Sequence, residues 1–219
     1  MLKIGHRGAK GYVAENTLAS FEHAIKLGCD GIELDVQYSK DEVPVVIHDV
    51  TVNRTTSAKG KVSDFTAAEL SNLGISSLVD VLTLVDEKCF VNIEIKNLFA
   101  TAEVVKIVSE FIKVRNWNPN LLPISSFDFE VLRKVKNLNP QLFLGVLTED
   151  SIAKALIFAL EIKAYAIHPE FKLLKNEIVL EIKKNKFKIF PFTVNHPEDL
   201  TFVKNFLVDG IISDFPDKI

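Results

Sequence analysis

Short apolar runs alternate with longer amphipathic segments along the whole chain. The short runs are rich in Val, Ile, Leu and Phe, and their length and composition predict β-strands. The predicted strands are Lys3–His6, Gly31–Val36, Val43–His48, Phe90–Ile95, Leu122–Ser126, Leu142–Leu147, Ala164–His168, Lys188–Val194 and Gly210–Ser213. Most of the segments between them carry apolar residues at helical spacing. The predicted helices are Asn16–Leu27, Leu78–Asp86, Ala102–Lys113, Phe129–Asn137, Ser151–Leu160, Leu174–Lys186 and Pro197–Phe206.

Regular alternation of strands and helices predicts a parallel sheet, and eight such units close into a (β/α)8 TIM barrel. One of the nine predicted strands must therefore be extra. Gly31–Val36 and Val43–His48 are joined only by Gln37–Glu42, whereas a parallel crossover needs about a dozen residues or more. We expect this pair to form an antiparallel hairpin that turns near Lys40 and Asp41. The remaining eight strands would then be the parallel strands of an α/β barrel.

The stretch from Asp49 to Ser77 interrupts the alternation after the second strand hairpin. It contains one predicted helix, Thr66–Leu73. We interpret residues 49–77 as an insertion that covers the mouth of the barrel, because a segment this short cannot bury a core of its own. The expected organisation is a single barrel domain over residues 1–219, since barrels of about 200–250 residues commonly form one domain.

Composition narrows the class of protein without identifying it. The 219 residues include 26 Lys and Arg against 29 Asp and Glu, for a net charge of −3. This balance argues against nucleic acid as the main partner. No apolar run is long enough to span a bilayer, and the first one already looks like a strand, so we expect a cytoplasmic protein without a transmembrane segment. The predicted surface helices show no self-complementary apolar patch, so no oligomeric state is predicted.

The first candidate site consists of acidic residues near the carboxyl ends of the strands, where barrels carry their active sites. Glu33 and Asp35 project to the same side of their strand, as do Glu94 and Lys96. Three carboxylates on apolar strands are costly to bury unless something neutralises them. A divalent cation would do so, and oxygen ligands favour Mg²⁺ or Ca²⁺ over Zn²⁺. The alternative is a set of structural salt bridges to Lys96 or Arg7.

Two histidines accompany these acids. His6 and His48 lie at predicted strand ends, and histidine is the usual general acid or base near neutral pH. On a phosphodiester, one ring could activate the attacking oxygen and the other could protonate the leaving oxygen. Arg7 and Lys96 could bind the phosphate oxygens and stabilise charge in the transition state.

The remaining reactive side chains receive structural interpretations. Cys29 and Cys89 adjoin apolar runs and are expected to be buried core thiols. His23 falls within a predicted helix and His196 in a loop, and both are interpreted as structural. His168 stands at a strand end, where either a structural or a functional role is open.

Several short strings, in order along the chain, resemble the glycerophosphodiester phosphodiesterases. None is specific alone, but their order and spacing together are. The strings are His6-Arg7-Gly8, Glu15-Asn16-Thr17, Gly31-Ile32-Glu33-Leu34-Asp35-Val36, Pro44-Val45-Val46-Ile47-His48-Asp49, Arg54-Thr55-Thr56, Asn92-Ile93-Glu94-Ile95-Lys96, Ser126-Phe127, Thr193-Val194-Asn195 and Asp209-Gly210-Ile211-Ile212-Ser213-Asp214-Phe215-Pro216.

The resemblance implies a barrel with a small insertion and hydrolysis of deacylated phospholipids to glycerol 3-phosphate and an alcohol. The implied roles are metal binding by Glu33, Asp35 and Glu94, acid–base catalysis by His6 and His48, and phosphate contact by Arg7 and Lys96. The attacking group could be water, or the substrate's own hydroxyl by way of a cyclic phosphate. The sequence departs from the family pattern at Ala14, where proline is frequent, at Phe192, where tryptophan is usual, and in Ile75–Leu78, which lacks a common proline.

Rival interpretations use the same fold. A lysophospholipase D-type enzyme acting on lysolipids would need apolar surface at the mouth, to which Phe65 and Leu73 could contribute. A catalytically inactive binder of phosphorylated ligands would usually lack one of the histidines or metal carboxylates, and here all are present. A plain barrel with structural salt bridges predicts no effect of metal on activity or melting temperature.

Overall fold

Eight parallel strands form the centre of the molecule, in a computed structural model that describes residues 1–219. Their order around the sheet is β8-β7-β6-β5-β4-β2-β1-β9, and β3 pairs only with β2. The strands are β1 Leu2–Gly5, β2 Gly31–Tyr38, β3 Pro44–Val46, β4 Phe90–Ile95, β5 Ile124–Ser126, β6 Leu144–Thr148, β7 Ala166–Pro169, β8 Lys188–Ile189 and β9 Gly210–Ser213. Each of the nine strands overlaps one of the nine predicted runs, and the barrel prediction is confirmed.

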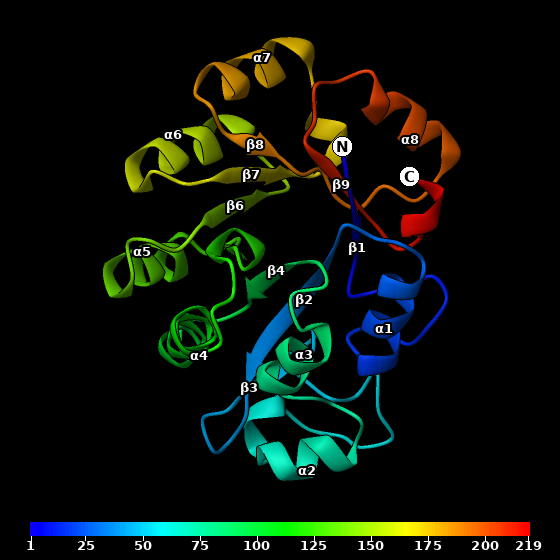
Figure 1. Cartoon of the computed structure of the whole chain (residues 1–219), viewed down its shortest axis with the longest axis vertical. Helices are drawn as coiled ribbons and strands as arrows, with labels where there is room; N and C mark the ends of the chain where they lie inside the picture. Colours follow the sequence, from blue (N-terminus) through cyan, green and yellow to red (C-terminus); the bar gives the residue numbers. More distant parts are fainter.

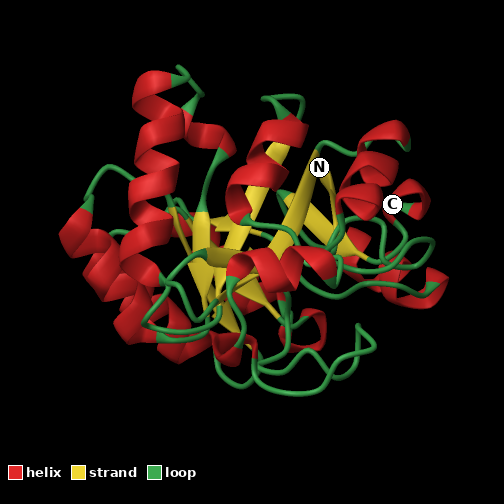
Figure 2. Cartoon of the chain, turned by 90° about the horizontal axis from the view of Figure 1, so that it is seen from below, coloured by secondary structure: helices red, strands yellow, loops and turns green.

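Helices surround the strands on the outside (Figure 1) and enclose them when the molecule is seen from a perpendicular direction (Figure 2). They are α1 Leu18–Lys26, α2 Ala67–Asn72, α3 Leu78–Val85, α4 Thr101–Val114, α5 Phe129–Leu138, α6 Ile152–Ile162, α7 Asn176–Lys184 and α8 Pro197–Lys204, with short 3-10 turns η1 Val62–Asp64, η2 Pro119–Leu121, η3 Phe171–Leu173 and η4 Pro216–Lys218. None of these helices is both long and apolar enough to cross a membrane.

Strand β8 is much shorter than the predicted Lys188–Val194. Its regular ladder ends at Ile189, two residues before Pro191, which has no N–H to donate. The backbone nevertheless continues beside β7, because Phe192 N donates to Pro169 O at 3.0 Å. The apolar pattern therefore located the strand but overestimated its length.

The sheet closes into a barrel between the β8 segment and β9. Asp209 N donates to Ile189 O, and Ile212 N donates to Pro191 O, both at 3.0 Å. Val194 N donates back to Ile212 O, also at 3.0 Å. These isolated bonds replace a continuous ladder, whereas the last strand lies beside the first through the regular β1–β9 ladder, in which Gly5 is opposite Ser213.

The predicted hairpin is present and brings His48 back to the barrel. Strands β2 and β3 are antiparallel, with Val36 opposite Val46. The same register continues beyond the ladder, since Ile47 N donates to Asp35 O at 3.0 Å. His48 therefore follows directly after a residue that is paired with the acidic end of β2.

The excursion over residues 49–77 packs on the outer side of this hairpin, where α2 lies beyond the helices that ring the barrel (Figure 1). Because strand residues alternate between faces, Val46 joins the main core, whereas Val45 and Ile47 join a separate small cluster. The other buried members of that cluster are Val52, Val62, Leu70 and Ile75. The insertion is thus attached to the barrel through β3, and His48, two residues after β3, lies in the site.

The barrel interior is apolar at one end and acidic at the other. Ile32, Leu34 and Val36 point outward into a core of 45 buried residues beneath the helices, which leaves Glu33 and Asp35 pointing inward. Residues earlier in the strands form an apolar floor inside the barrel. Its buried members are Ile4, Phe90, Ala166, Phe190 and Ile212. The floor closes the barrel below the acids, so the acidic end opens only toward the loops.

A left-handed turn after β1 sets the backbone of the site. Arg7 and Gly8 have φ values of 52° and 85°, and Arg7 O accepts hydrogen bonds from Asn16 N at 3.0 Å and from Ser20 Oγ at 3.1 Å. A Cβ atom on Gly8 would lie 2.4 Å from Ser20 Oγ and 2.7 Å from Ser20 C. The close approach of helix α1 therefore requires glycine here.

We expect Gly8→Ala to destabilise the fold more than Gly28→Ala. Both glycines have positive φ, 85° and 76°, but a Cβ atom on Gly28 would meet nothing within 4 Å. Gly28→Ala should cost about 1–2 kcal/mol for the left-handed backbone alone, and Gly8→Ala about 1–3 kcal/mol more for the overlap with Ser20. Urea unfolding of the two variants measures the difference, and equal losses would contradict the close approach.

Candidate active site

The centre of the site is a triad of carboxylates from two neighbouring strands. Glu33 and Asp35 come from β2 and Glu94 from β4, and Asp35 lies directly opposite Glu94 in the parallel ladder. One oxygen atom of each carboxylate lies within 4.8 Å of the others. The three residues are 4%, 1% and 8% exposed, so water screens their mutual repulsion only weakly.

Two cationic side chains partly neutralise the triad. Lys96 Nζ donates to Glu94 Oε1 at 2.6 Å and lies 3.2 Å from Asp35 Oδ1. Arg7 Nε lies 3.2 Å from Asp35 Oδ2 but makes no hydrogen bond, although it is buried. Glu33 accepts only the backbone N–H of Arg7, at 3.0 Å. Three carboxylates facing two cations leave an excess of negative charge.

The pKa values of the triad reflect this excess. Burial, together with the charges of Asp35 and Glu94, raises the pKa of Glu33 well above its usual range. Burial and the charge of Asp35 also raise the pKa of Glu94, to about 7, against the opposing effect of Lys96. Burial acts in the same direction on Asp35, but the nearby charges of Lys96 and Arg7 lower its pKa overall. The site thus favours either protons or an added cation.

Asn16 holds the Asp35 carboxylate in place. Its side-chain nitrogen donates to Asp35 Oδ2 at 2.8 Å, and its side-chain oxygen accepts from Asp35 N at 3.3 Å. Asn16 has φ of 57° and precedes helix α1, whose N-cap is Thr17. Thr17 therefore caps the helix, and the Asn16 side chain is directed to the site.

His6 is oriented from the far end of the chain. Its Nδ1 lies 2.6 Å from Asp214 Oδ1, and Asn195 Nδ2 donates to the other Asp214 oxygen at 2.9 Å. The Nε2 atom is left facing the triad, 4.0 Å from Glu33 Oε2. Burial lowers the pKa of His6 below its usual value, and the hydrogen bond to Asp214 opposes that shift.

His48 has an analogous arrangement. Its Nδ1 lies 2.8 Å from Asp49 Oδ1, and its backbone oxygen accepts from Gln37 Nε2 at 3.0 Å. Arg54 in turn donates to both oxygens of Asp49, at 2.7 and 3.0 Å. Each histidine thus presents Nε2 for chemistry while an aspartate fixes Nδ1.

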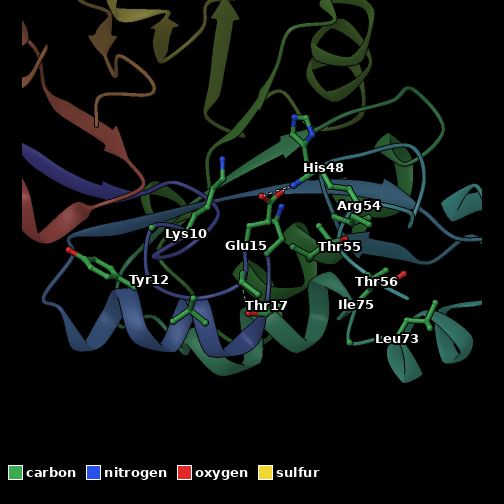
Figure 3. A pocket seen from close by; sticks show the side chains of 17 residues that line it. Lys10, Tyr12, Glu15, Thr17, His48, Arg54, Thr55, Thr56, Leu73 and Ile75 are labelled. Carbon is green, nitrogen blue, oxygen red and sulfur yellow. Dashed lines mark hydrogen bonds and ion pairs between the residues drawn. The ribbon is translucent and has the colours of Figure 1, made fainter. Parts of the chain in front are cut away.

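Arg54 also connects His48 to the phosphate-binding candidate Arg7. Its two terminal nitrogens donate to Glu15 at 2.9 and 2.7 Å, and Glu15 accepts a third bond, at 2.7 Å, from Arg7. Figure 3 shows Glu15 and Arg54 meeting beside His48 in the groove between the 10–17 loop and the insertion. Burial alone would raise the pKa of Glu15, but the two guanidinium groups lower it to about 2. Glu15 is therefore ionised at neutral pH.

Two hollows meet at His48. The inner cavity, of about 200 Å³, is lined by both histidines, Arg7, Lys96 and the acids Glu33 and Glu94. The outer groove, of about 590 Å³, is the one shown in Figure 3 and runs toward Leu73 and Ile75 of the insertion. All seven site residues predicted from the sequence therefore gather at the inner cavity, with Asp35 beneath its surface.

The other predicted residues lie outside this cluster. His23 is in α1 with its ring 5.7 Å from that of Tyr12, and His196 is the exposed residue before α8. His168 is 1% exposed in the barrel, where burial lowers its pKa to about 3. Both cysteines are free, and Cys89 is buried as predicted, whereas Cys29 is only half-buried.

Sequence reasoning did not assign roles to the residues that orient the histidines and Arg7. Asp214, Asn195, Asp49, Arg54 and Glu15 all occur in the strings that carry the family resemblance. The signal was present in the motifs, but Asp214 is 208 residues from His6, and only the pairing of β1 with β9 brings the two together. Of the apolar residues considered at the mouth, Phe65 packs against the small cluster of the insertion, and Leu73 lines the outer groove.

Comparisons with known proteins agree with this geometry. A family model described as the glycerophosphoryl diester phosphodiesterase family matches residues 6–218. A glycerophosphodiester phosphodiesterase of Caldanaerobacter subterraneus subsp. tengcongensis is 40% identical, with coverage of 100% of this chain and 96% of the relative.

Solved structures give the same result. The crystal structure of a glycerophosphodiester phosphodiesterase from Thermotoga maritima has a TM-score of 0.87 and 30% identity, covering 100% of this chain and 96% of that one. An Oleispira antarctica phosphodiesterase, solved in complex with the product sn-glycerol-3-phosphate, has a TM-score of 0.89 and 26% identity, covering 99% and 94%. This chain belongs to the glycerophosphoryl diester phosphodiesterase family.

Proposed function

We propose that this chain hydrolyses glycerophosphodiesters to glycerol 3-phosphate and an alcohol, and that it uses a divalent cation, Mg²⁺ or Ca²⁺, held by Glu33, Asp35 and Glu94. The observation that carries the proposal is the buried triad beside two aspartate-oriented histidines. The names of the relatives and the glycerol 3-phosphate complex of the Oleispira protein support the substrate class.

The triad suits a hard cation because it offers only carboxylate oxygens. A bound dication would supply Lewis-acid polarisation of a phosphoryl oxygen and a lowered pKa for a hydroxyl or water. The three carboxylates together with the two cations, Arg7 and Lys96, carry one net negative charge. The two charges of a dication would change this to one net positive charge. A phosphodiester carries one negative charge, so the substrate completes the neutralisation.

Arg7 and Lys96 bind the phosphate in this proposal. Both already lie at the triad, and Arg7 Nε is a buried donor without an acceptor. An unsatisfied buried donor costs free energy, which an anionic oxygen in the cavity would recover. Glu15 fixes the other end of the Arg7 guanidinium, so this donor stays directed at the site.

His6 and His48 divide the proton transfers. Because Asp214 and Asp49 accept from Nδ1, a neutral ring presents an acceptor at Nε2 and a protonated ring presents a donor there. One ring takes the proton of the attacking oxygen, and the other protonates the departing alkoxide. The chain acts in this proposal as one barrel unit, residues 1–219, with the 49–77 insertion supplying Arg54.

Release of glycerol 3-phosphate from glycerophosphocholine tests the proposal. We expect release with Mg²⁺ or Ca²⁺ and none in EDTA, and a loss of about a hundredfold or more in kcat/KM for Glu33→Gln and His6→Ala. His23→Ala is the matched control, because it removes a histidine outside the site and should retain activity. Lysophosphatidylcholine is assayed in parallel, and turnover of that lipid alone would favour the lysolipid alternative.

Arg54→Gln tests whether the Arg54 bonds to Asp49 and Glu15 position the catalytic groups. We expect kcat/KM to fall by about 10–100-fold, as for other residues that orient catalytic side chains, while the unfolding free energy falls by about 1 kcal/mol or less because Arg54 is a surface residue. The control is Arg133→Gln, since Arg133 is a surface arginine that also bridges two carboxylates, far from the site. Wild-type kcat/KM in Arg54→Gln would contradict the positioning role.

A further inference from the structure

The mouth of the inner cavity has two chemically different halves. The charged residues come from β1, β2 and β4, with Asp214 following β9, and these four strands are neighbours in the sheet. Asn92 and Ile212, on β4 and β9, line the same side, and the rest of the lining comes from the other side of the ring, from β6 and from the segments that follow β5, β6 and β8. It consists of Phe127, Leu147, Glu149, Phe192 and Thr193. This second half carries no cationic side chain, and the catalytic proposal does not use it.

Two aromatic rings form the wall of the second half. Phe127 and Phe192 have ring centroids 5.8 Å apart and planes at 89°, an edge-to-face pair that leaves ring surface open to the cavity. Phe127 remains 38% exposed. Hydrogen bonds tie the segments that carry the rings to neighbouring parts of the barrel, since Phe192 O accepts from Phe171 N at 3.0 Å and Ser126 Oγ, one residue before Phe127, donates to Ile95 O at 2.7 Å. Both rings therefore project from segments that the fold positions.

Glu149 adds an unpaired negative charge to this wall. It directly follows β6, and its carboxylate is the only one lining the inner cavity that takes part in no ion pair or hydrogen bond. Lys154 lines a neighbouring hollow together with Glu149 and Asp150 but forms no ion pair with either acid. A free carboxylate beside two aromatic rings attracts an ammonium group through both charge and cation–π interaction.

The outer groove does not offer the same chemistry. Its charged lining includes Lys10 and Arg54, which repel a cation, and its one acid, Glu15, is already bonded to two arginines. A neutral polyol would find few hydrogen-bonding partners along the aromatic wall, and an anionic alcohol would be repelled by Glu149. The wall is therefore complementary to an alcohol that has an apolar surface and a positive charge.

We propose that Phe127, Phe192 and Glu149 bind the departing alcohol and favour substrates in which it carries an ammonium group, as choline and ethanolamine do. This inference rests on the proposed phosphodiesterase function. With the phosphate at Arg7 and Lys96, the alcohol extends across the cavity from the charged half to the aromatic half. The three residues act on specificity, and the proton transfers stay with the histidines.

The test compares glycerophosphocholine with its uncharged isostere, in which 3,3-dimethylbutanol replaces choline. Both release glycerol 3-phosphate, so one assay reads both. We expect the wild-type chain to prefer the choline ester by about tenfold or more in kcat/KM, the size of a partly desolvated cation–π and charge contact. Glu149→Gln should remove most of that preference by slowing the choline ester while leaving the isostere within about twofold.

Two further variants make the result specific. Phe127→Leu keeps an apolar side chain but removes the ring, and should also reduce the preference for the choline ester. Asp150→Asn removes the neighbouring acid, which does not line the inner cavity, and should leave the preference intact. A loss as large in Asp150→Asn as in Glu149→Gln would overturn the subsite in favour of a general field effect.

The possible outcomes distinguish a failure of this inference from a failure of the proposed phosphodiesterase function. Equal turnover of the two esters by the wild-type chain would overturn the subsite and leave the phosphodiesterase function standing. Absence of glycerol 3-phosphate from both esters, with either metal, would overturn the function itself. A parallel loss on both esters in a folded Glu149→Gln variant would assign Glu149 to the general architecture of the mouth and contradict its role in specificity.

Discussion

Mutual repulsion among three buried carboxylates is the constraint on which this site depends. At an effective dielectric constant of about 20, two unit charges at the 4.8 Å limit of the triad repel by roughly 3 kcal/mol. The barrel imposes this proximity because Glu33 and Asp35 share one face of β2 and Glu94 is paired with Asp35 in the next strand. Lys96 and Arg7 offset part of the repulsion, and burial together with the remainder raises the pKa values of the two glutamates. A divalent cation would remove that remainder.

The polar residues around the triad are held by the fold at both ends of the chain. Asp214, after the last strand, fixes His6, after the first, so the histidine is oriented only when β1 and β9 pair. His48 is held through Asp49 by Arg54 of the insertion. The insertion over residues 49–77 thus contributes directly to the site. It supplies one arginine that connects His48 to Glu15 and, through it, to the phosphate-binding candidate Arg7.

Much of this arrangement could be predicted from the sequence because it depends on local periodicity. Alternation within β2 placed Glu33 and Asp35 on one face, and the short Gln37–Glu42 connection required a hairpin that returns His48 to the acids. The length of β8 was overestimated because the apolar pattern does not register the N–H missing from Pro191. The contact of His6 with Asp214 depends on the pairing of the first and last strands, β1 and β9, which no local pattern encodes.

The same limit applies to the two halves of the mouth. Phe127, Glu149 and Phe192 follow three different strands. Phe127 belongs to a family string and Phe192 replaces a usual tryptophan, but neither pattern places the two rings on one wall. Their convergence on one cavity wall is set by the circular order of the strands. The family strings locate the charged half of the site, since its residues occur in the strings around His6, Glu33, His48 and Glu94. The aromatic half becomes visible only in three dimensions.

Calorimetric titration of the metal-free chain with Mg²⁺ and with Ca²⁺ tests the central claim most directly, because it measures binding to the triad without reference to any substrate. The account predicts one site per chain, with an affinity reduced at least about tenfold in Glu94→Gln, and unchanged in Glu130→Gln, which removes a surface carboxylate paired with Arg133. Absence of binding by the folded wild-type chain, or equal affinity in Glu94→Gln, would contradict it.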